Sequence, residues 1–321
     1  MIYRNTHRLF ALCATILIVF GLLPFSRALA ETARDAHHLV PTGKGWGVAQ
    51  DNSPFTVIQG NGINYHGGPV MPATVNVYFI WYGNWSSGPH ASDSAATVNL
   101  LDDFFGSSGG IGGSGYELIN STYGDNVNNV SGNVALAKST FDNYSQSKRL
   151  SDSKVLTVVS RALSGGKLPL DSDGIYFVLT SSDVTETSGF CTRYCGWHTH
   201  ATVSGTDIKY SFVGNPDRCP SACEAQTVSP NGDSGADGMA SIMAHESEEA
   251  ISDPDLNAWY DASGFENADK CAWMFGPTTG TIGAGAYNET FGTHNWLIQM
   301  NWENASGGGC AQTLGGPFYT Y

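Results

Sequence analysis

The sequence predicts a single α/β domain, with one mixed sheet, flanking helices and a second half stapled by disulfides. Two observations predict this class. Apolar runs rich in β-branched and aromatic residues alternate with helical patterns, which is the layout of helices packed on one sheet. Six of the seven cysteines fall between residues 191 and 310. A folded portion of about 250 residues is a size that one domain accommodates.

The predicted elements follow one another without an internal repeat. Residues 74–82 (TVNVYFIWY) are a continuous apolar run, which favours a strand near the centre of the sheet. Gly165 and Gly166 close a helix over 153–164, although the valines of that segment would also suit a strand. In chain order the prediction is a strand over 74–82, a helix over 93–106, a strand over 133–140, a helix over 153–164, strands over 174–181 and 208–214, and a helix over 237–252.

The first thirty residues have the pattern of a secretory signal. Arg4 and Arg8 precede an apolar stretch over 9–25, and Ala28-Leu29-Ala30 is a small-residue cleavage site. A signal anchor is the alternative, but Pro24 shortens the apolar run below what a spanning helix needs, and no later stretch is long enough. We therefore expect a signal peptide over 1–30, a flexible leader or pro-segment over 31–64, a globular domain over 65–321, and a secreted protein of the extracellular space or cell wall.

The charge of the chain excludes some partners. The formal net charge is −14, and removal of the signal takes away three arginines and no acid, which makes it more negative still. Such a surface repels nucleic acid and anionic lipid. It suits work among cations or neutral polymers, so the expected partners are an extracellular protein or a cell-wall polymer, with no nucleic acid and no membrane span. The sequence does not indicate an oligomeric state.

The cysteines that remain after signal removal form an even set. In an oxidising compartment this predicts three disulfides, and the sequence leaves their pairing open. Zinc held by the first four cysteines is the alternative, which the spacing of three residues within each pair and the signal for export disfavour. The six residues are Cys191, Cys195, Cys219, Cys223, Cys271 and Cys310.

The predicted helix over 237–252, with Asp237 as its N-cap, carries the sequence HESEE. On a helix, His245 and Glu249 share one face and can both bind one metal, and Glu246 lies beside them to take a proton from a water on that metal. This is the geometry of H-E-x-x-H with glutamate in place of the second histidine. Zinc accepts imidazole and carboxylate ligands, and a catalytic zinc keeps three protein ligands. Zinc is therefore the expected cofactor.

The motif resembles that of the metzincin peptidases, whose third ligand stands ten residues after the first histidine. The resemblance implies Asp255 as third ligand, with Asp253 as the alternative. This chain departs from the metzincin pattern at Glu249 and at Ser252, where metzincins have a glycine. The order of sheet strands before the motif helix is also similar to that of the zincins, so the expected α/β fold is zincin-like.

Three other interpretations of these residues stay open. Glu246 to Glu249 could be a solvated acidic face of the helix. The acids at 253, 255, 261, 266 and 269 form an oxygen-rich loop that could hold a structural calcium ion, although without EF-hand spacing. His198 and His200 alternate like one face of a strand, and are candidates for metal ligands or for cleft residues that bind substrate.

Several segments in one order carry a family resemblance. They are YHGGPVM (65–71), FIWYGNW (79–85), FCTRYCGWHT (190–199), FVGNP (212–216) and SPNGDSGADGM (229–239). With these segments the chain resembles the EXORDIUM or phosphate-induced protein family, over about residues 65–311. The resemblance implies a secreted protein associated with the cell wall or apoplast and brings no established reaction. Plant members usually have small residues where this chain has HESEE, so this chain has more potential chemistry.

Two functions follow from the sequence. The first is a secreted zinc-dependent peptidase or related hydrolase. The second is a non-catalytic extracellular protein that binds wall carbohydrate or acts in signalling, with exposed aromatic rings stacked on sugars. The candidate rings for that role are Trp81, Trp85, Trp197, Trp259, Trp296 and Trp302.

Overall fold

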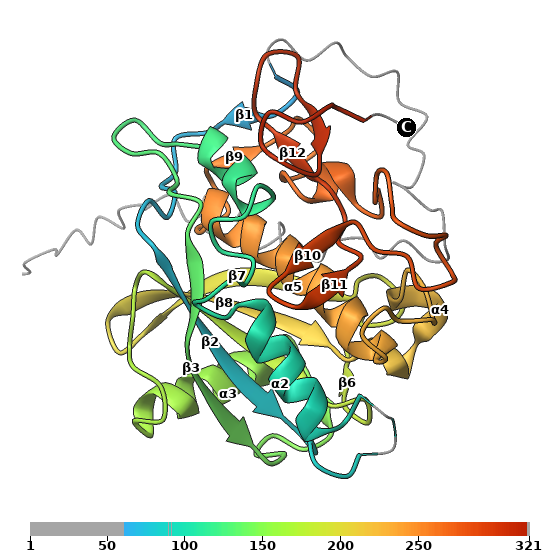
Figure 1. Ribbon diagram of the computed structural model, residues 1–321. Helices are drawn as coiled ribbons and strands as arrows, with labels where there is room; N and C mark the ends of the chain where they lie inside the picture. Colours follow the sequence, from blue (N-terminus) through green and yellow to red (C-terminus); the bar gives the residue numbers. More distant parts are fainter. Residues whose placement is uncertain (1–60, 89, 91, 320–321) are drawn as a thin grey trace, which may run out of the picture. The chain divides into compact units, whose positions relative to one another are not determined.

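The computed structural model describes residues 61–319, apart from 89 and 91 (Figure 1). The predicted signal peptide and nearly all of the predicted leader lie outside these residues. The last leader residues are described: Ile63 is buried, and β1 (Asn64–Tyr65) pairs with β9 (Trp259–Tyr260). Within the described part of the chain, no helix is both long enough and apolar enough to cross a membrane.

A five-stranded mixed sheet forms the centre of the fold, as the sequence predicts. Its strand order is β3-β2-β5-β8-β7; the first four strands run parallel, and β7 pairs antiparallel with β8 at one edge. Every residue of β5 is buried, because helices cover both faces of the sheet. The strands are β2 (Val75–Tyr82), β3 (Val134–Asp142), β5 (Gly174–Thr180), β7 (Gly196–Val203) and β8 (Thr206–Gly214).

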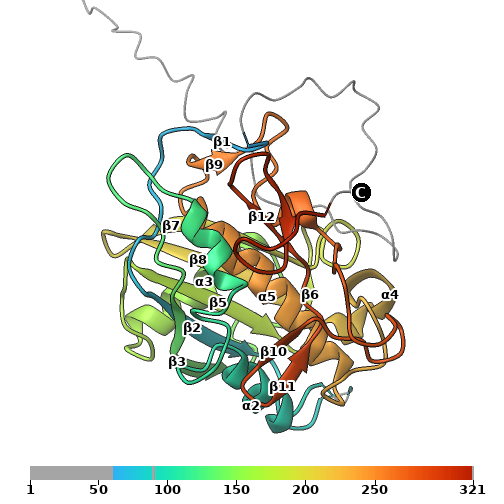
Figure 2. The ribbon, with the colours of Figure 1, turned by 45° about the horizontal axis from the view of Figure 1, so that its top comes forward.

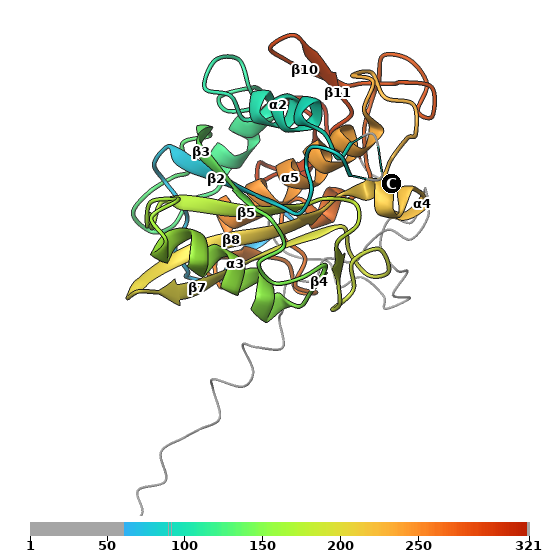
Figure 3. The same cartoon turned by 90° about the horizontal axis from the view of Figure 1, so that it is seen from below.

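The long helices lie on both faces of this sheet. Figure 3 shows α3 (Asp152–Ser164) on one face and α2 (Ala95–Phe104) and α5 (Ser234–Ser252) on the other. The valines that left α3 ambiguous are buried on its inner side, so packing decides for a helix there. Ser94 caps α2 by accepting a hydrogen bond from the Thr97 N–H.

Short elements surround the sheet. The β10–β11 hairpin lies beside α2, where Phe291 packs edge-to-face on Phe104 with ring centroids 5.6 Å apart (Figure 2). These short elements are not predicted from the sequence, because strands of two or three residues show no periodicity. They are β4 (Arg149–Leu150), β6 (Thr185–Glu186), β10 (Glu289–Phe291), β11 (His294–Trp296), β12 (Asn301–Glu303), β13 (Gly309–Ala311), the short helix α4 (Pro220–Cys223) and 3₁₀ turns at Glu117–Thr122, Pro216–Arg218 and Asp269–Cys271.

Helix α5 begins earlier than predicted. Its N-cap is Asp233, whose side chain accepts from the Ala236 N–H, and the prediction of Asp237 as N-cap is wrong. Asp237 lies one turn further on, where its carboxylate accepts hydrogen bonds from Ser229 and Asn231. The helix ends at Ser252, as predicted from the following Asp-Pro pair.

Three disulfides staple the second half of the chain, as predicted. They are Cys191–Cys219, Cys195–Cys223 and Cys271–Cys310. The first two each span 28 residues and connect the chain leading into β7 with the segment that precedes α5.

Candidate metal centre

The acidic motif of α5 is buried. Glu246 is 1% exposed, and Glu248 and Glu249 are 0% exposed. The interpretation of these residues as a solvated face is therefore wrong. Glu248 faces away from the other two acids: its carboxyl accepts from the Asn301 amide at 2.5 Å and lies against Glu117. Burial, together with the Glu117 carboxylate, raises the pKa of Glu248 well above its ordinary value, which favours its neutral form.

His245 and Glu249 meet a third acid that follows the helix. His245 Nε2 lies 3.1 Å from Glu249 Oε1 and 3.6 Å from Asp269 Oδ1. The backbone N–H of Asp269 donates to the same Glu249 oxygen at 2.9 Å, which fixes the loop against the helix. We call His245, Glu249 and Asp269 the His245 group.

Neither acid expected from the metzincin spacing is in the His245 group. Asp255 lies 3.0 Å from the Lys209 ammonium and 3.9 Å from His200, in a cluster with Asp207. The Asp253 carboxylate accepts from the N–H groups of two residues that follow it, at 2.6 and 2.5 Å, and so caps the turn. Asp255 thus lies against Lys209 of β8, and the residue that follows it, Leu256, has a left-handed φ of 55°.

Strand β7 brings a second histidine to the same carboxylates. His198 Nδ1 lies 3.5 Å from Glu246 Oε2 and 3.5 Å from Glu249 Oε2. Its other ring nitrogen, Nε2, lies 3.6 Å from Glu266 Oε1. We call His198, Glu246 and Glu249 the His198 group. His200 is one strand period away and contacts Asp207 at 3.0 Å, so the two histidines of the strand have different surroundings.

Strand and helix approach closely at Gly196. A Cβ atom there would lie 2.6 Å from Ile242 Cγ2 and 2.9 Å from Glu246 Oε1. Real Cβ contacts are longer than this, so only glycine lets β7 bring His198 this close to α5.

Burial and the closely spaced carboxylates together set the pKa values of this site. Burial alone lowers the pKa of the His245 imidazole, but the carboxylates of Glu249 and Asp269 outweigh it and hold that pKa well above its ordinary value. His198 is raised in the same way, with burial opposed by Glu246 and Glu249. Burial and the neighbouring acids raise the pKa of Glu266 well above its usual range. The site therefore attracts positive charge.

The distances within both groups suit a metal ion. An ion with tetrahedral bonds of about 2.1 Å separates its ligand atoms by about 3.4 Å. The nitrogen–oxygen separations of 3.1, 3.5 and 3.6 Å fall around that value. Each histidine also has its other ring nitrogen held by a buried polar group: Gln299 Nε2 lies 2.6 Å from His245 Nδ1, and Glu266 faces His198. Metal-ligating histidines donate their other ring N–H to such a partner, as His198 can to Glu266, whereas the Gln299 amide donates to His245 and holds its ring in place.

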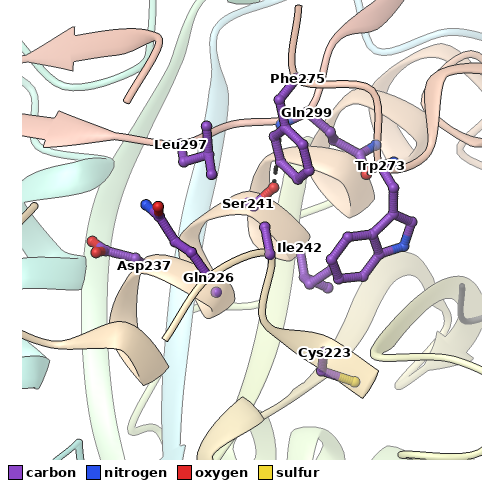
Figure 4. Close-up of a pocket in the computed structure, with 11 residues that line it drawn as sticks. Cys223, Gln226, Asp237, Ser241, Ile242, Trp273, Phe275, Leu297 and Gln299 are labelled. Atoms are coloured by element: carbon purple, nitrogen blue, oxygen red, sulfur yellow. Dashed lines mark hydrogen bonds between the residues drawn. The ribbon is translucent and has the colours of Figure 1, made fainter. Parts of the chain in front are cut away.

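A pocket lies beside the His245 group (Figure 4). Ser241 and Ile242 of α5 face the aromatic rings of Trp273 and Phe275 across it, and Gln299 closes one side. Gln299 is the residue that contacts His245, and its N–H donates to Ser241 Oγ at 3.3 Å. The pocket therefore lies next to the imidazole that the candidate metal would use.

Three residues of this site are not predicted as site residues from the sequence. Asp269 and Glu266 are part of the oxygen-rich loop considered for calcium, so their oxygen chemistry is visible in the sequence but their convergence on α5 is not. Gln299 is 54 residues from His245 and has no local pattern that would single it out.

Comparisons with known proteins agree with the motifs of the sequence. Residues 63–296 match the family described as "Phosphate-induced protein 1 conserved region". Protein EXORDIUM-like 5 of Arabidopsis thaliana is 33% identical, with 75% of each chain covered. Protein EXORDIUM-like 3 of the same plant is 31% identical over 75% of this chain and 80% of its own. Protein PHOSPHATE-INDUCED 1 of Nicotiana tabacum is 26% identical over 66% and 72%.

No solved structure gives a significant match. The three disulfides and the EXORDIUM relatives are consistent with a secreted protein. The family match covers more than half of the chain and includes the four cysteines of the first two disulfides. The chain belongs to the EXORDIUM, or phosphate-induced protein, family.

Proposed function

We propose that this protein is a secreted zinc-dependent hydrolase of the peptidase type. The observation that carries the proposal is the His245 group, in which an imidazole nitrogen and two carboxylate oxygens lie within 4.8 Å of one another. Asp269 takes the place that Asp255 or Asp253 was expected to fill. Three protein ligands leave a position open for water and substrate, which is the arrangement of catalytic zinc sites.

The residues of the chain divide the work. Zinc, when bound, polarises a carbonyl and lowers the pKa of water. Glu246 follows His245 directly on α5 and is buried beside Glu249, so its carboxylate is positioned to accept the proton of the attacking water. Gln299 holds the His245 ring from behind and Asp269 binds from the loop.

Two features of the chain support a zincin-like hydrolase working outside the cell. The motif helix follows the sheet strands in the order that zincins use, and it lies against the antiparallel edge strand β7. The disulfides support an oxidising compartment. An extracellular protein or a cell-wall polymer is the partner that such a protein would meet. A structural calcium ion in the loop after α5 has less support than zinc, because Glu266 and Asp269 of that loop face the histidine groups.

The alternative, a non-catalytic carbohydrate-binding protein, has less support. Four of the six candidate tryptophans belong to the core, so their rings cannot stack on sugars; only Trp259 and Trp302 are half-buried. The core rings are Trp81, Trp85, Trp197 and Trp296, which are exposed by 4% or less.

The experiment measures bound zinc and hydrolysis of casein on the exported chain. The Glu246→Gln variant should retain zinc at the His245 group and lose about 10²- to 10⁴-fold in rate, the usual contribution of a general base. Glu248→Gln is the matched control, because Glu248 lies on the same helix, is as deeply buried and contacts Asn301 outside both groups. It should keep the wild-type rate. A wild-type chain with neither zinc nor hydrolytic activity would overturn the proposal.

A further inference from the structure

We propose that the site holds two cations, with a second one bound by His198 and bridged to the first by the Glu249 carboxylate. This rests on the proposed function for the first cation. It adds a site on strand β7 that the helix motif alone does not contain.

The two oxygens of Glu249 point into different groups. Oε1 lies 3.1 Å from His245 Nε2, and Oε2 lies 3.5 Å from His198 Nδ1. A carboxylate whose oxygens each face a different imidazole has the geometry of a bridging ligand. Paired metal ions that share a bridge lie about 3.5–4 Å apart.

The His198 group repeats the features of the His245 group. One imidazole nitrogen and two carboxylate oxygens lie within 4.8 Å of one another, and all three side chains are buried. The second ring nitrogen faces Glu266, as the second nitrogen of His245 faces Gln299. A carboxylate on the far side of a histidine fixes its tautomer and increases its basicity as a ligand.

The distances suit a shared cation. Both carboxylates lie 3.5 Å from Nδ1, close to the spacing of about 3.4 Å between neighbouring ligands around an ion. Gly196 maintains this spacing by letting the strand approach Glu246 without a side chain in between.

Five buried or half-buried carboxyl groups face one another here, from Glu246, Glu249, Asp253, Glu266 and Asp269. Buried charges are paired or coordinate metals, so this cluster suits bound cations.

The second cation gives Glu246 a further role. Oε2 becomes a ligand of this ion, while the carboxylate still accepts the proton of the attacking water. A variant at Glu246 then loses the second cation as well as the rate, whereas a general base alone would lose only the rate.

The experiment counts zinc per chain by mass spectrometry of the exported protein after dialysis against zinc and then against zinc-free buffer. Wild type should hold two ions, and His198→Gln and Glu246→Gln one each. His200→Gln is the control on the same strand and should hold two, because His200 faces Asp207 instead. One ion in wild type and still one in His198→Gln would overturn the second site and leave the proposed function standing. No ion in wild type would overturn both.

A measurement on wild type keeps the test independent of how the variants fold. Manganese replaces zinc, and electron paramagnetic resonance distinguishes a pair from an isolated ion. Two manganese ions bridged by one carboxylate should give an exchange-coupled spectrum. The spectrum of an isolated ion at full loading would contradict a bridged pair.

Discussion

His198 on the edge strand β7 lies 3.5 Å, from Nδ1 to Oε2, from Glu249 on helix α5. The contact joins two elements that the chain builds separately, and both partners are buried. Through it, the acidic motif of α5 forms one side of the candidate site and strand β7 forms the other. Variants on either side measure what each element contributes.

Asp269 should be the third ligand of the His245 group. Asp269→Ala removes an oxygen 3.6 Å from His245 Nε2, and we expect it to lose the zinc at that group and the hydrolytic rate with it. Asp255→Ala is the matched control: it breaks an ion pair with Lys209 near the surface, costs about 0.2–1 kcal/mol of stability, and should leave zinc content unchanged. Titration with a zinc indicator measures both. If the Asp255 variant loses zinc and the Asp269 variant keeps it, the third ligand is Asp255, as the metzincin spacing implies.

Gln299 should position His245 without touching the metal. Gln299→Leu leaves the ring nitrogen Nδ1 without its contact at 2.6 Å, and we expect about a 10- to 100-fold loss in zinc affinity. Gln299→Glu should exceed wild-type affinity, because a carboxylate accepts the Nδ1 proton and leaves Nε2 to bind the metal, whereas the amide nitrogen of Gln299 donates to Nδ1. Competition with a chelator of known affinity gives the ratio. Equal affinities for the leucine variant and wild type would show that the contact does not orient the ring.

Gly196 should be required for the approach of strand to helix. Gly196→Ala places a methyl group 2.6 Å from Ile242 and 2.9 Å from a Glu246 oxygen, and overpacking of this kind costs about 1–3 kcal/mol. We expect that loss in urea unfolding, together with weaker metal binding. Thr202→Ala, on the exposed part of the same strand, is the control and should change neither quantity. Unchanged stability of the Gly196 variant would mean that the strand has room to move.

Asp237 should make stability depend on pH. Burial raises its pKa from 3.8 to about 6, against the opposing hydrogen bonds from Ser229 and Asn231. Because the folded state binds the proton more tightly than the unfolded chain, the stabilisation is full below about pH 4 and is lost as the pH rises through about 6, by about 3 kcal/mol in all. Asp237→Asn has no proton to lose. Its unfolding free energy should therefore gain on that of wild type between pH 4 and 7, and parallel urea curves across that range would contradict this.

The sheet and the long helices could be predicted because each carries its own periodicity. The apolar run over 74–82 became β2, and Ser252 before Asp-Pro is where α5 ends. In the sequence, strand β7 was indicated only by its alternating histidines, because cysteines and turn residues flank the strand. The predicted start of α5 was late, since two aspartates compete as caps and only the contacts of Asp237 with Ser229 and Asn231 decide between them.

The candidate site could be predicted only as far as one helix reaches. His245 and Glu249 share a face by spacing alone, and the structure brings them together. The third acid depends on how the chain turns after the helix, and the left-handed Leu256 in that turn has no sequence pattern that marks it. The burial of the acids was also invisible, because a run such as E-S-E-E is typical of exposed helices.

The disulfides Cys191–Cys219 and Cys195–Cys223 connect the start of β7 to the segment before α5. In the loop-entropy account each contributes about 3–4 kcal/mol for its 28-residue span. The strand that carries His198 is thus tied covalently to the segment that leads into the acidic helix. These crosslinks decide the host for recombinant expression. Protein made in a reducing cytosol lacks both disulfides, so an inactive preparation would show only that the disulfides are missing and would not test the proposed reaction. Periplasmic or endoplasmic-reticulum expression yields the material on which zinc counts and rates carry meaning.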